Sequence, residues 1–244
     1  MKAVIVAAGM GSRLWNKNDQ VPKTLLPFAD ETILATIMRN IAATGICEFV
    51  IVVGYQKHEI IDYLSQADRF GFQVEFIENP DWRRGNGISV LAAEPAVNGR
   101  PFLLSMSDHI VSVPALQRVV NHQSSSNLLL VDPNVNDIFD LDDATKVEVV
   151  GNRIVNIGKE IHPYNGIDCG IFKLTPRFFD AMRAQLVVQK ESISAAVQRL
   201  IQQDDMEAVF LEAQETWIDI DTPEAYNHAL QKLAGQPHGG TSIQ

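Results

Sequence analysis

Residues 1–28 read MKAVIVAAGMGSRLWNKNDQVPKTLLPF, and this stretch determines how the rest of the chain is interpreted. Residues 3–7 form a short apolar run rich in β-branched side chains, which predicts a buried strand. The run stops just before Gly9 and Gly11, whose conformational freedom lets the backbone turn with its N–H groups pointing inward. A concave set of amides binds anions, so the stretch predicts a strand followed by a phosphate-binding loop.

Two basic residues follow the same loop. Arg13 and Lys23 place fixed positive charge where a bound triphosphate would need it. We therefore expect the opening stretch to bind the phosphates of a nucleotide.

The opening loop departs from two familiar phosphate loops. A P-loop has four residues between its glycines and then Gly-Lys-Ser/Thr, whereas one residue separates Gly9 from Gly11 and no Gly-Lys follows. The dinucleotide fingerprint fits at these glycines but has Leu14 at its third position. The next predicted strand, 49–53, also ends in Gly54 instead of an acidic residue that would hold a ribose. A dehydrogenase is therefore disfavoured.

The overall charge excludes some partners. Asp and Glu outnumber Lys and Arg by 30 to 20, and the net charge of −10 disfavours non-specific binding to nucleic acid or to an anionic membrane. No apolar run is long enough for a membrane helix and no signal sequence is recognisable, so we expect a soluble cytoplasmic protein without membrane insertion. Cys47 and Cys169 suggest neither a disulfide nor a zinc site, and Cys47 is expected in the core.

Helix-like and strand-like stretches alternate along the chain. In the first half, helices are predicted at 31–44, 58–67 and 87–94, and strands at 49–53, 72–77 and 102–106. This order predicts an α/β fold with a mostly parallel central sheet and helices on both faces. The second half adds a hairpin (145–150 with 153–157), a strand (168–174), a helix (192–202), an extended segment (216–221) and a last helix opened by Pro223, which predicts a small strand-rich lobe.

No repeat and no linker divides the sequence. We expect a single domain over residues 1–234 and a disordered tail over 235–244, where the composition changes.

Carboxylates lie where a ligand is expected. Ligands of parallel sheets bind at the carboxyl ends of the strands, and Asp108 follows the predicted strand 102–106. It is either a divalent-cation ligand or an ordinary turn residue. Asp219 and Asp221 have period-two spacing and face the same side of an extended segment. Asp221 precedes Pro223 and is expected to cap the last helix, which leaves Asp219 as the better candidate for binding Mg²⁺.

Two further groups of residues allow more than one interpretation. Gly85-Asn86-Gly87 immediately precedes a predicted helix, where it is either a turn and cap or a reader of the edge of a nucleobase. Lys146 and Lys159 lie in strand-rich segments, and on their own they are typical of a solvated face.

The chain resembles the sugar-phosphate nucleotidyltransferases, through AAGMGSR, VPKTLLPF, Asp108 and WIDIDTPE. Within that family it is most similar to the inositol-1-phosphate cytidylyltransferases, through ENPDWRRGNGIS, LLSMSDHIV and the segment from 140 to 172. The resemblance implies a Rossmann-like nucleotidyltransferase fold. It also implies Mg²⁺-dependent transfer of CMP from CTP to a phosphorylated polyol, with inositol 1-phosphate as the best candidate.

The resemblance also implies roles for individual residues. Catalysis would depend on Arg13, Lys23 and Asp108, and the metal ion would bind Asp108 and Asp219. The nucleotide would contact Ala8, Gly9, Gly11, Ser12, Arg13, Asn86, Gly87 and Ser89. The acceptor would contact Lys146, Lys159 and Asp168, the lysines through its phosphate and Asp168 through a hydroxyl.

The resemblance leaves the acceptor and the activity open to alternatives. Phosphocholine, a phosphonate or a sugar 1-phosphate are other acceptors, and phosphocholine would need a cage such as Trp82, Tyr164 and Tyr55 could build. Members of the inositol group are often fused to a membrane-embedded transferase that consumes the CDP product, so we expect a separate CDP-alcohol-using enzyme here. The alternatives from other classes are a non-catalytic nucleotide-binding protein of the same fold and a glycosyltransferase.

Overall fold

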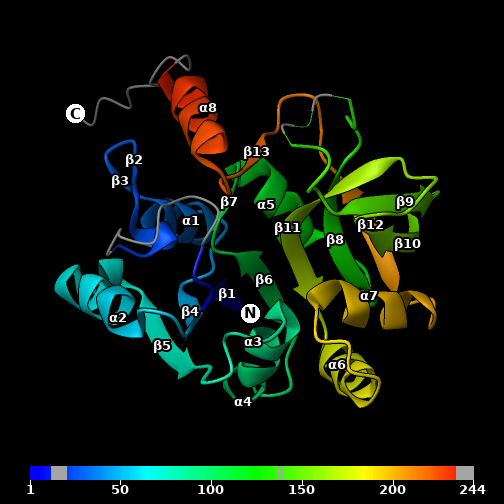
Figure 1. Cartoon of the computed structure of the whole chain (residues 1–244), viewed down its shortest axis with the longest axis horizontal. Helices are drawn as coiled ribbons and strands as arrows, with labels where there is room; N and C mark the ends of the chain where they lie inside the picture. Colours follow the sequence, from blue (N-terminus) through cyan, green and yellow to red (C-terminus); the bar gives the residue numbers. More distant parts are fainter. Residues whose placement is uncertain (12–20, 137, 139, 235–244) are drawn as a thin grey trace.

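A computed structural model describes residues 1–11, 21–136, 138 and 140–234 of the chain. Its centre is a nine-stranded sheet with the order β5-β4-β1-β6-β11-β8-β12-β10-β9 (Figure 1). These strands are β1 (Lys2–Ala7), β4 (Glu48–Val53), β5 (Gln73–Glu78), β6 (Phe102–Met106), β8 (Asn127–Asp132), β9 (Lys146–Val150), β10 (Arg153–Gly158), β11 (Gly166–Leu174) and β12 (Met206–Phe210).

The sheet has a parallel half and a mixed half. β5, β4, β1 and β6 run parallel, whereas β11 is antiparallel to both β6 and β8. The predicted hairpin is present as β9 and β10, with Gly151 at its turn in the left-handed region (φ 65°). The prediction of an α/β fold with a small strand-rich lobe is confirmed, although the antiparallel β11 makes the whole sheet mixed.

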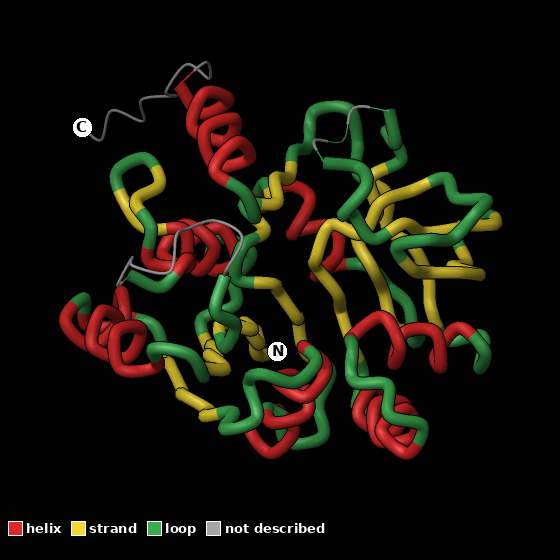
Figure 2. Tube along the Cα trace, viewed as in Figure 1, coloured by secondary structure: helices red, strands yellow, loops and turns green. Residues whose placement is uncertain are grey.

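Helices cover both faces of the sheet (Figure 2). One face packs against α1 (Ile33–Ala42), α2 (Lys57–Gln66), α5 (Val113–Asn121) and α8 (Pro223–Ala234). The other face packs against α3 (Asn86–Ala92), α4 (Glu94–Val97), α6 (Arg177–Val187) and α7 (Ile193–Ile201). Both faces of the sheet are covered because both faces of its strands are apolar. In β1, for example, Ala3 and Ile5 enter the first core, whereas Val4 and Val6 enter the second.

Short elements complete the chain. They are the 3₁₀ turns Lys23–Leu25 and Asp68–Gly71, the pair β2 (Pro27–Phe28) and β3 (Glu31–Thr32), and the pair β7 (His109–Val111) and β13 (Trp217–Asp219). No described helix is long and apolar enough to cross a membrane.

Two expectations from the sequence are wrong. Cys47 is exposed, because it lies in the turn before β4 next to Ile46, and Ile46 is the residue that enters the core. Asp221 does not cap the last helix, because the backbone N–H of Ala225 donates to the Thr222 hydroxyl at 3.1 Å. Pro223 does begin α8, as predicted.

Candidate active site

The site lies where β1 and β6 end, and a small second sheet assembles it. After β6 the chain turns and forms β7, which pairs with β13 so that His109 is opposite Asp219. The Asp108 carbonyl also accepts a hydrogen bond from the N–H of Ile220 at 2.9 Å. Segments about 110 residues apart in sequence are thereby joined, and their carboxylates are brought together.

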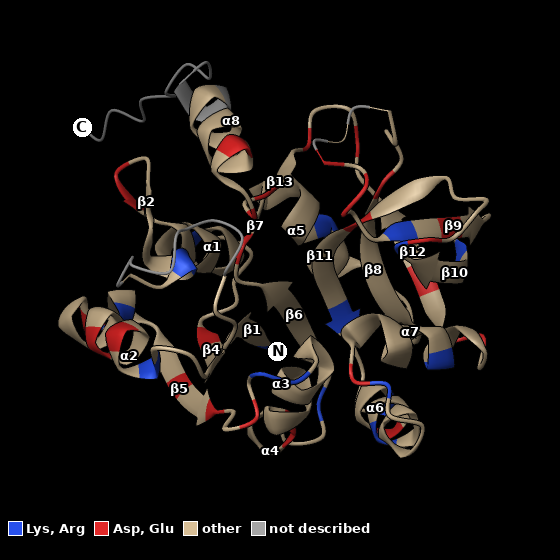
Figure 3. Ribbon diagram, in the orientation of Figure 1, with Lys and Arg blue, Asp and Glu red and all other residues tan. Residues whose placement is uncertain are grey.

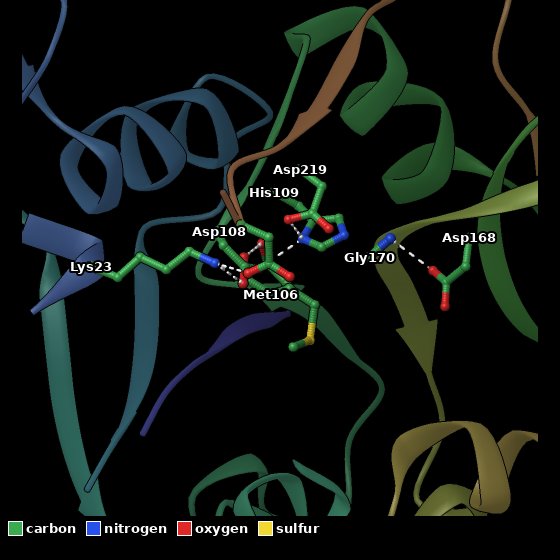
Figure 4. A network of polar contacts seen from close by, with 9 residues as sticks. Lys23, Met106, Asp108, His109, Asp168, Gly170 and Asp219 are labelled. Carbon is green, nitrogen blue, oxygen red and sulfur yellow. Dashed lines mark hydrogen bonds and ion pairs between the residues drawn. The ribbon is translucent and has the colours of Figure 1, made fainter. Parts of the chain in front are cut away.

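Lys23 enters this group of carboxylates from the opposite segment (Figure 4). Its Nζ donates to Asp108 Oδ2 at 2.8 Å and also contacts Asp221 Oδ1. The side chain is almost completely buried, and it passes next to the opening loop. A Cβ on Gly11, which has φ 62°, would lie 2.8 Å from Lys23 Cβ. Gly11 is therefore required by backbone conformation and by the close approach of Lys23.

His109 occupies the space between the carboxylates (Figure 4). Its Nδ1 lies 2.7 Å from Asp108 Oδ1 and 3.7 Å from Asp219 Oδ1. The ring stacks on Trp217 with centroids 5.7 Å apart and an interplanar angle of 19°. The sequence did not identify His109 or Trp217 as site residues. In the sequence, His109 is marked only by its position next to Asp108. Trp217 is marked only by its position two residues before Asp219.

The charges in this cluster shift one another's pKa values. Burial alone would raise the pKa of Asp108, but the charges of Lys23 and His109 outweigh it and hold this pKa far below its usual range. Burial would likewise lower the pKa of Lys23 and of His109. The neighbouring carboxylates instead raise the pKa of Lys23, and they raise that of His109 to about 9. Asp108 is therefore ionised at neutral pH.

The predicted metal ligands Asp108 and Asp219 lie in one cluster with His109. One oxygen or nitrogen atom of each lies within 4.8 Å of the others. Asp219 Oδ1 is buried, and among the described residues nothing donates a hydrogen bond to it. Burial is the main reason that the pKa of Asp219 rises to about 6. A buried carboxylate oxygen beside a second carboxylate fits a hard divalent cation such as Mg²⁺, which prefers oxygen ligands.

A cavity of about 210 Å³ opens beside the cluster. It extends from Asp108 and Asp219 toward the lobe formed by β9 and β10. Its charged and polar lining includes Asn86, Asp140, Asp143, Thr145, Lys159, Asp168, Ser194 and Thr222. Acidic groups predominate along this wall. Figure 3 shows acidic segments in the loops near β11 and β13.

Of the three predicted acceptor residues, Lys159 and Asp168 line the cavity and Lys146 does not. The Lys159 side chain contacts Asp143 Oδ1. Lys146 is buried behind this segment, where its Nζ donates to the Lys159 carbonyl at 2.7 Å.

Asp168 lies at an irregularity in β11. The pairing of β11 with β8 shifts register between Asp168 and Phe172, and Gly170 within this interval has φ 72°. The Gly170 N–H donates to Asp168 Oδ1 at 2.7 Å, which holds the carboxylate beside its own strand. Burial raises the pKa of Asp168 to about 6 despite that hydrogen bond and the charge of His109.

The predicted nucleobase residues lie in and behind the cavity wall. Asn86 lines the cavity, and its Oδ1 accepts the N–H of Ile193 at 2.9 Å. Gly87 is packed so closely that a Cβ would lie 2.5 Å from Met182 Sδ, and its N–H donates to the Glu191 carbonyl. The Ser89 hydroxyl is buried and accepts a hydrogen bond from Asn79 at 2.9 Å.

The phosphate-binding residues are described in part. Ala8 is buried, and its carbonyl accepts the N–H of Tyr55 at 3.0 Å, which ties the end of β1 to the end of β4. Gly9 and Gly11 follow at the same edge of the sheet. The predicted contributions of Ser12 and Arg13 lie outside the described residues.

Known proteins of similar sequence include two bifunctional proteins that match nearly the whole of this chain. The bifunctional IPC transferase and DIPP synthase of Thermococcus kodakarensis is 30% identical over 240 residues, which cover 98% of this chain and 52% of that protein. The bifunctional protein GlmU of Methanococcus maripaludis is 28% identical over 98% of this chain and 57% of its own length. The chain thus spans about half the length of the curated relatives it matches.

Solved structures with the same fold support the resemblance. The inositol-1-phosphate CTP transferase from T. maritima superposes with a TM-score of 0.83 at 26% identity, covering 96% of both chains. The UDP-glucose pyrophosphorylase of Acinetobacter baumanii shares the fold, with a TM-score of 0.78 at 20% identity over 95% of this chain and 92% of that one. The predicted resemblance to the nucleotidyltransferases is confirmed. Residues 3–217 match the profile of the MobA-like NTP transferase domain, and the chain belongs to that family.

Proposed function

We propose that the protein transfers CMP from CTP to a phosphorylated polyol, with inositol 1-phosphate as the preferred acceptor, and that the reaction requires Mg²⁺. The observation that carries the proposal is the contact of Lys23 with Asp108 and Asp221. Asp219 lies beside them, and the opening glycine loop lies at the same edge of the sheet. The likeness to an inositol-1-phosphate CTP transferase over 96% of the chain supports the choice of nucleotide and acceptor.

The reaction needs no nucleophile from the protein. An oxygen of the acceptor phosphate attacks the α-phosphorus of CTP and forms a new P–O bond. The bond from the α-phosphorus to the oxygen it shares with the β-phosphorus breaks, and pyrophosphate leaves with the electron pair. The protein contributes positioning and neutralisation of charge.

Lys23 would neutralise the charge that develops on the α-phosphate and the incoming phosphate. It is held close to the site by Asp108 and Asp221 and by the opening loop at Gly11. The N–H groups of Gly9 and Gly11 would hold the triphosphate, and Ser12 and Arg13 are proposed to complete this set.

Asp108 and Asp219 would hold the Mg²⁺ ion. When bound, this ion neutralises phosphate oxygens and helps to fix the in-line geometry. Asp219 Oδ1 is buried and accepts no hydrogen bond within the described part of the chain, which supports this assignment.

The side chain of Asn86 supports the choice of a pyrimidine nucleotide whose base has hydrogen-bond acceptors on its edge. Because a backbone N–H can only donate, the Asn86 atom that meets Ile193 must be Oδ1, and the amide NH₂ is left to donate to a ligand. Cytosine offers two adjacent acceptors, its ring N3 and its carbonyl O2, to such a donor.

The acidic wall of the cavity supports a hydroxylated acceptor. Asp140, Asp143 and Asp168 offer carboxylates that accept hydrogen bonds from hydroxyl groups, and Lys159 offers a charge for the phosphate. A quaternary ammonium would be better matched by aromatic faces. Within the described part of the chain, Trp82, Tyr55 and Tyr164 do not line the cavity, and Tyr55 and Trp82 pack on each other with centroids 5.2 Å apart.

The test is a pyrophosphate-release screen that combines four nucleoside triphosphates with several phosphorylated acceptors. We expect release to depend on CTP, on Mg²⁺ and on inositol 1-phosphate, and to stop when EDTA is added. Preference for phosphocholine, aminoethylphosphonate or a sugar 1-phosphate would change the acceptor but keep the reaction. Tight CTP binding with no release for any acceptor would favour a non-catalytic nucleotide-binding protein. Turnover would also imply a CDP-alcohol-using activity that consumes the product.

A further inference from the structure

We propose that His109 is a positioning residue, which holds Asp108 in the orientation that binds the metal ion and does not itself bind the metal. The sequence assigned no role to this histidine. The inference depends on the proposed function only in taking Asp108 and Asp219 as the metal ligands. The hydrogen bonds and packing around the imidazole ring carry it.

The two oxygens of Asp108 are each held by a different side chain. Lys23 Nζ donates to Oδ2 at 2.8 Å, and His109 Nδ1 lies 2.7 Å from Oδ1 (Figure 4). A carboxylate oxygen has two lone pairs, so one remains on each oxygen for another partner. Two fixed hydrogen bonds set the plane of the carboxylate, and they aim the remaining lone pairs.

His109 is unsuited to binding the metal directly. The ring nitrogen that faces Asp108 and Asp219 is Nδ1, and its hydrogen is directed at Asp108, so it has no lone pair for a metal held by these carboxylates. The other nitrogen, Nε2, lies on the far side of the ring, toward Gly170. Both the neutral Nδ1–H tautomer and the cation carry this hydrogen, so the role does not depend on the charge of the ring. Mg²⁺ also prefers oxygen ligands over imidazole. Asp219 Oδ1, 3.7 Å away and without a hydrogen-bond donor among the described residues, is the oxygen left for the metal.

The surroundings of the ring leave it little freedom to turn. Trp217 stacks on it, and the Trp217 indole N–H donates to Asp132 Oδ2 at 2.7 Å, which fixes the stacking partner. Gly170 approaches so closely that a Cβ there would lie 2.5 Å from His109 Cδ2 and 3.0 Å from Nε2. The ring of His109, in β7, is therefore restrained by residues of three other strands: Trp217 in β13, Asp132 in β8 and Gly170 in β11. Such support is expected of a group whose orientation matters.

His109→Asn and His109→Leu form a matched pair of variants. Asn and Leu have almost the same shape and both remove the stacking ring, but only Asn places an N–H close to the position of Nδ1. The probe is Mn²⁺, whose free concentration is followed by electron paramagnetic resonance in the absence of nucleotide. We expect His109→Leu to weaken Mn²⁺ binding by about 10- to 100-fold, the usual cost of losing a group that orients a ligand, and His109→Asn to weaken it by less than about threefold.

Melting temperatures of the two variants serve as the control for folding. Similar melting temperatures with different Mn²⁺ affinities support the inference, because a purely structural role would affect both variants alike. Equal Mn²⁺ affinities for the two variants would overturn it. So would a directly bonded ¹⁴N in the electron spin-echo spectrum of Mn²⁺ bound to the wild type, or a wild-type protein that binds no Mn²⁺. These readouts do not involve CTP or an acceptor, so they are independent of the pyrophosphate screen.

Discussion

The two ends of the cavity hold their charged side chains in different ways. At one end the Lys23 and Asp108 side chains are 6% and 20% exposed and belong to a network with His109 and Asp221. At the other end the Lys159 and Asp143 side chains are 50% and 37% exposed. A buried network fixes the positions of its members, whereas a solvated ion pair contributes little and rearranges easily. We infer that the buried end performs a fixed chemical step and that the exposed end adapts to the acceptor.

The largest effect is expected at the buried end. Lys23→Met removes the charge that stabilises the transferring phosphate, and we expect the turnover number at saturating CTP to fall by about 10²- to 10³-fold, equivalent to about 2.7–4 kcal/mol. Lys173→Met is the matched control, since Lys173 Nζ donates to the carbonyls of Val120 and His122, away from the cavity. The control should lose stability but keep its turnover number. Normal turnover by Lys23→Met at saturation would mean that Lys23 is misassigned.

A second substitution tests the fixed end through its packing. Gly170→Ala places a methyl group against the His109 ring, and we expect it to weaken Mn²⁺ binding by about tenfold. Gly151→Ala is the control, because Gly151 also has a positive φ but none of the described residues lies within 4 Å of its added Cβ. Both variants should lose about 1–2 kcal/mol of stability to the left-handed backbone. Equal Mn²⁺ binding by the two variants would show that the close approach of Gly170 to His109 has no role.

The exposed end should respond more weakly. Lys159→Met is expected to raise the KM for inositol 1-phosphate about fivefold, or about 1 kcal/mol, because the lost ion pair is largely solvated. The turnover number should change by less than a factor of about two, since the charge acts on binding. Steady-state kinetics with varied acceptor measures both values. A large fall in turnover with an unchanged KM would place Lys159 at the chemical step instead.

The smallest effect concerns stability and pH. Burial raises the pKa of Asp168 from 3.8 to about 6, so the folded protein holds this proton more tightly than the unfolded chain. Ionisation of Asp168 therefore lowers the free energy of unfolding by its full amount above pH 6, and this loss of stability disappears below about pH 4. We expect Asp168→Asn to melt about 2–4 °C above the wild type at pH 8, corresponding to about 1 kcal/mol. The difference should shrink at pH 4.5, and a difference that instead grows toward low pH would contradict the shifted pKa.

The sequence predicted the buried end better than the exposed end, for a physical reason. β1, the glycine turn and Lys23 lie within one stretch of 23 residues, and local patterns are sufficient to interpret them. Asp108 was also predicted, because it follows a strand at the edge where ligands of such sheets bind, and Asp219 was predicted because it shares one side of an extended segment with Asp221. Their proximity, however, depends on the pairing of β7 with β13, which no local pattern encodes.

The residues that the sequence did not identify act across long separations. The positioning role proposed for His109 depends on the β13 pairing and on the irregularity in β11 that brings Gly170 against its ring. β8 was not predicted either, although its apolar run 128–131 is of the same kind as the run 3–7 from which a strand was predicted. Lys146 is a different case. Its role in binding the acceptor was predicted from the resemblance alone, and in the structure this lysine is buried behind the cavity wall.

The most direct test of transfer at the Lys23 end is a ³¹P NMR record of CTP, Mg²⁺ and inositol 1-phosphate incubated with the protein. We predict a diphosphate diester, in which the α-phosphorus of the nucleotide is joined to the acceptor phosphate, and pyrophosphate in equal amount. CMP with pyrophosphate would instead indicate hydrolysis. An unchanged spectrum, for every nucleotide and acceptor in the screen, would contradict the assignment of this cluster to nucleotidyl transfer.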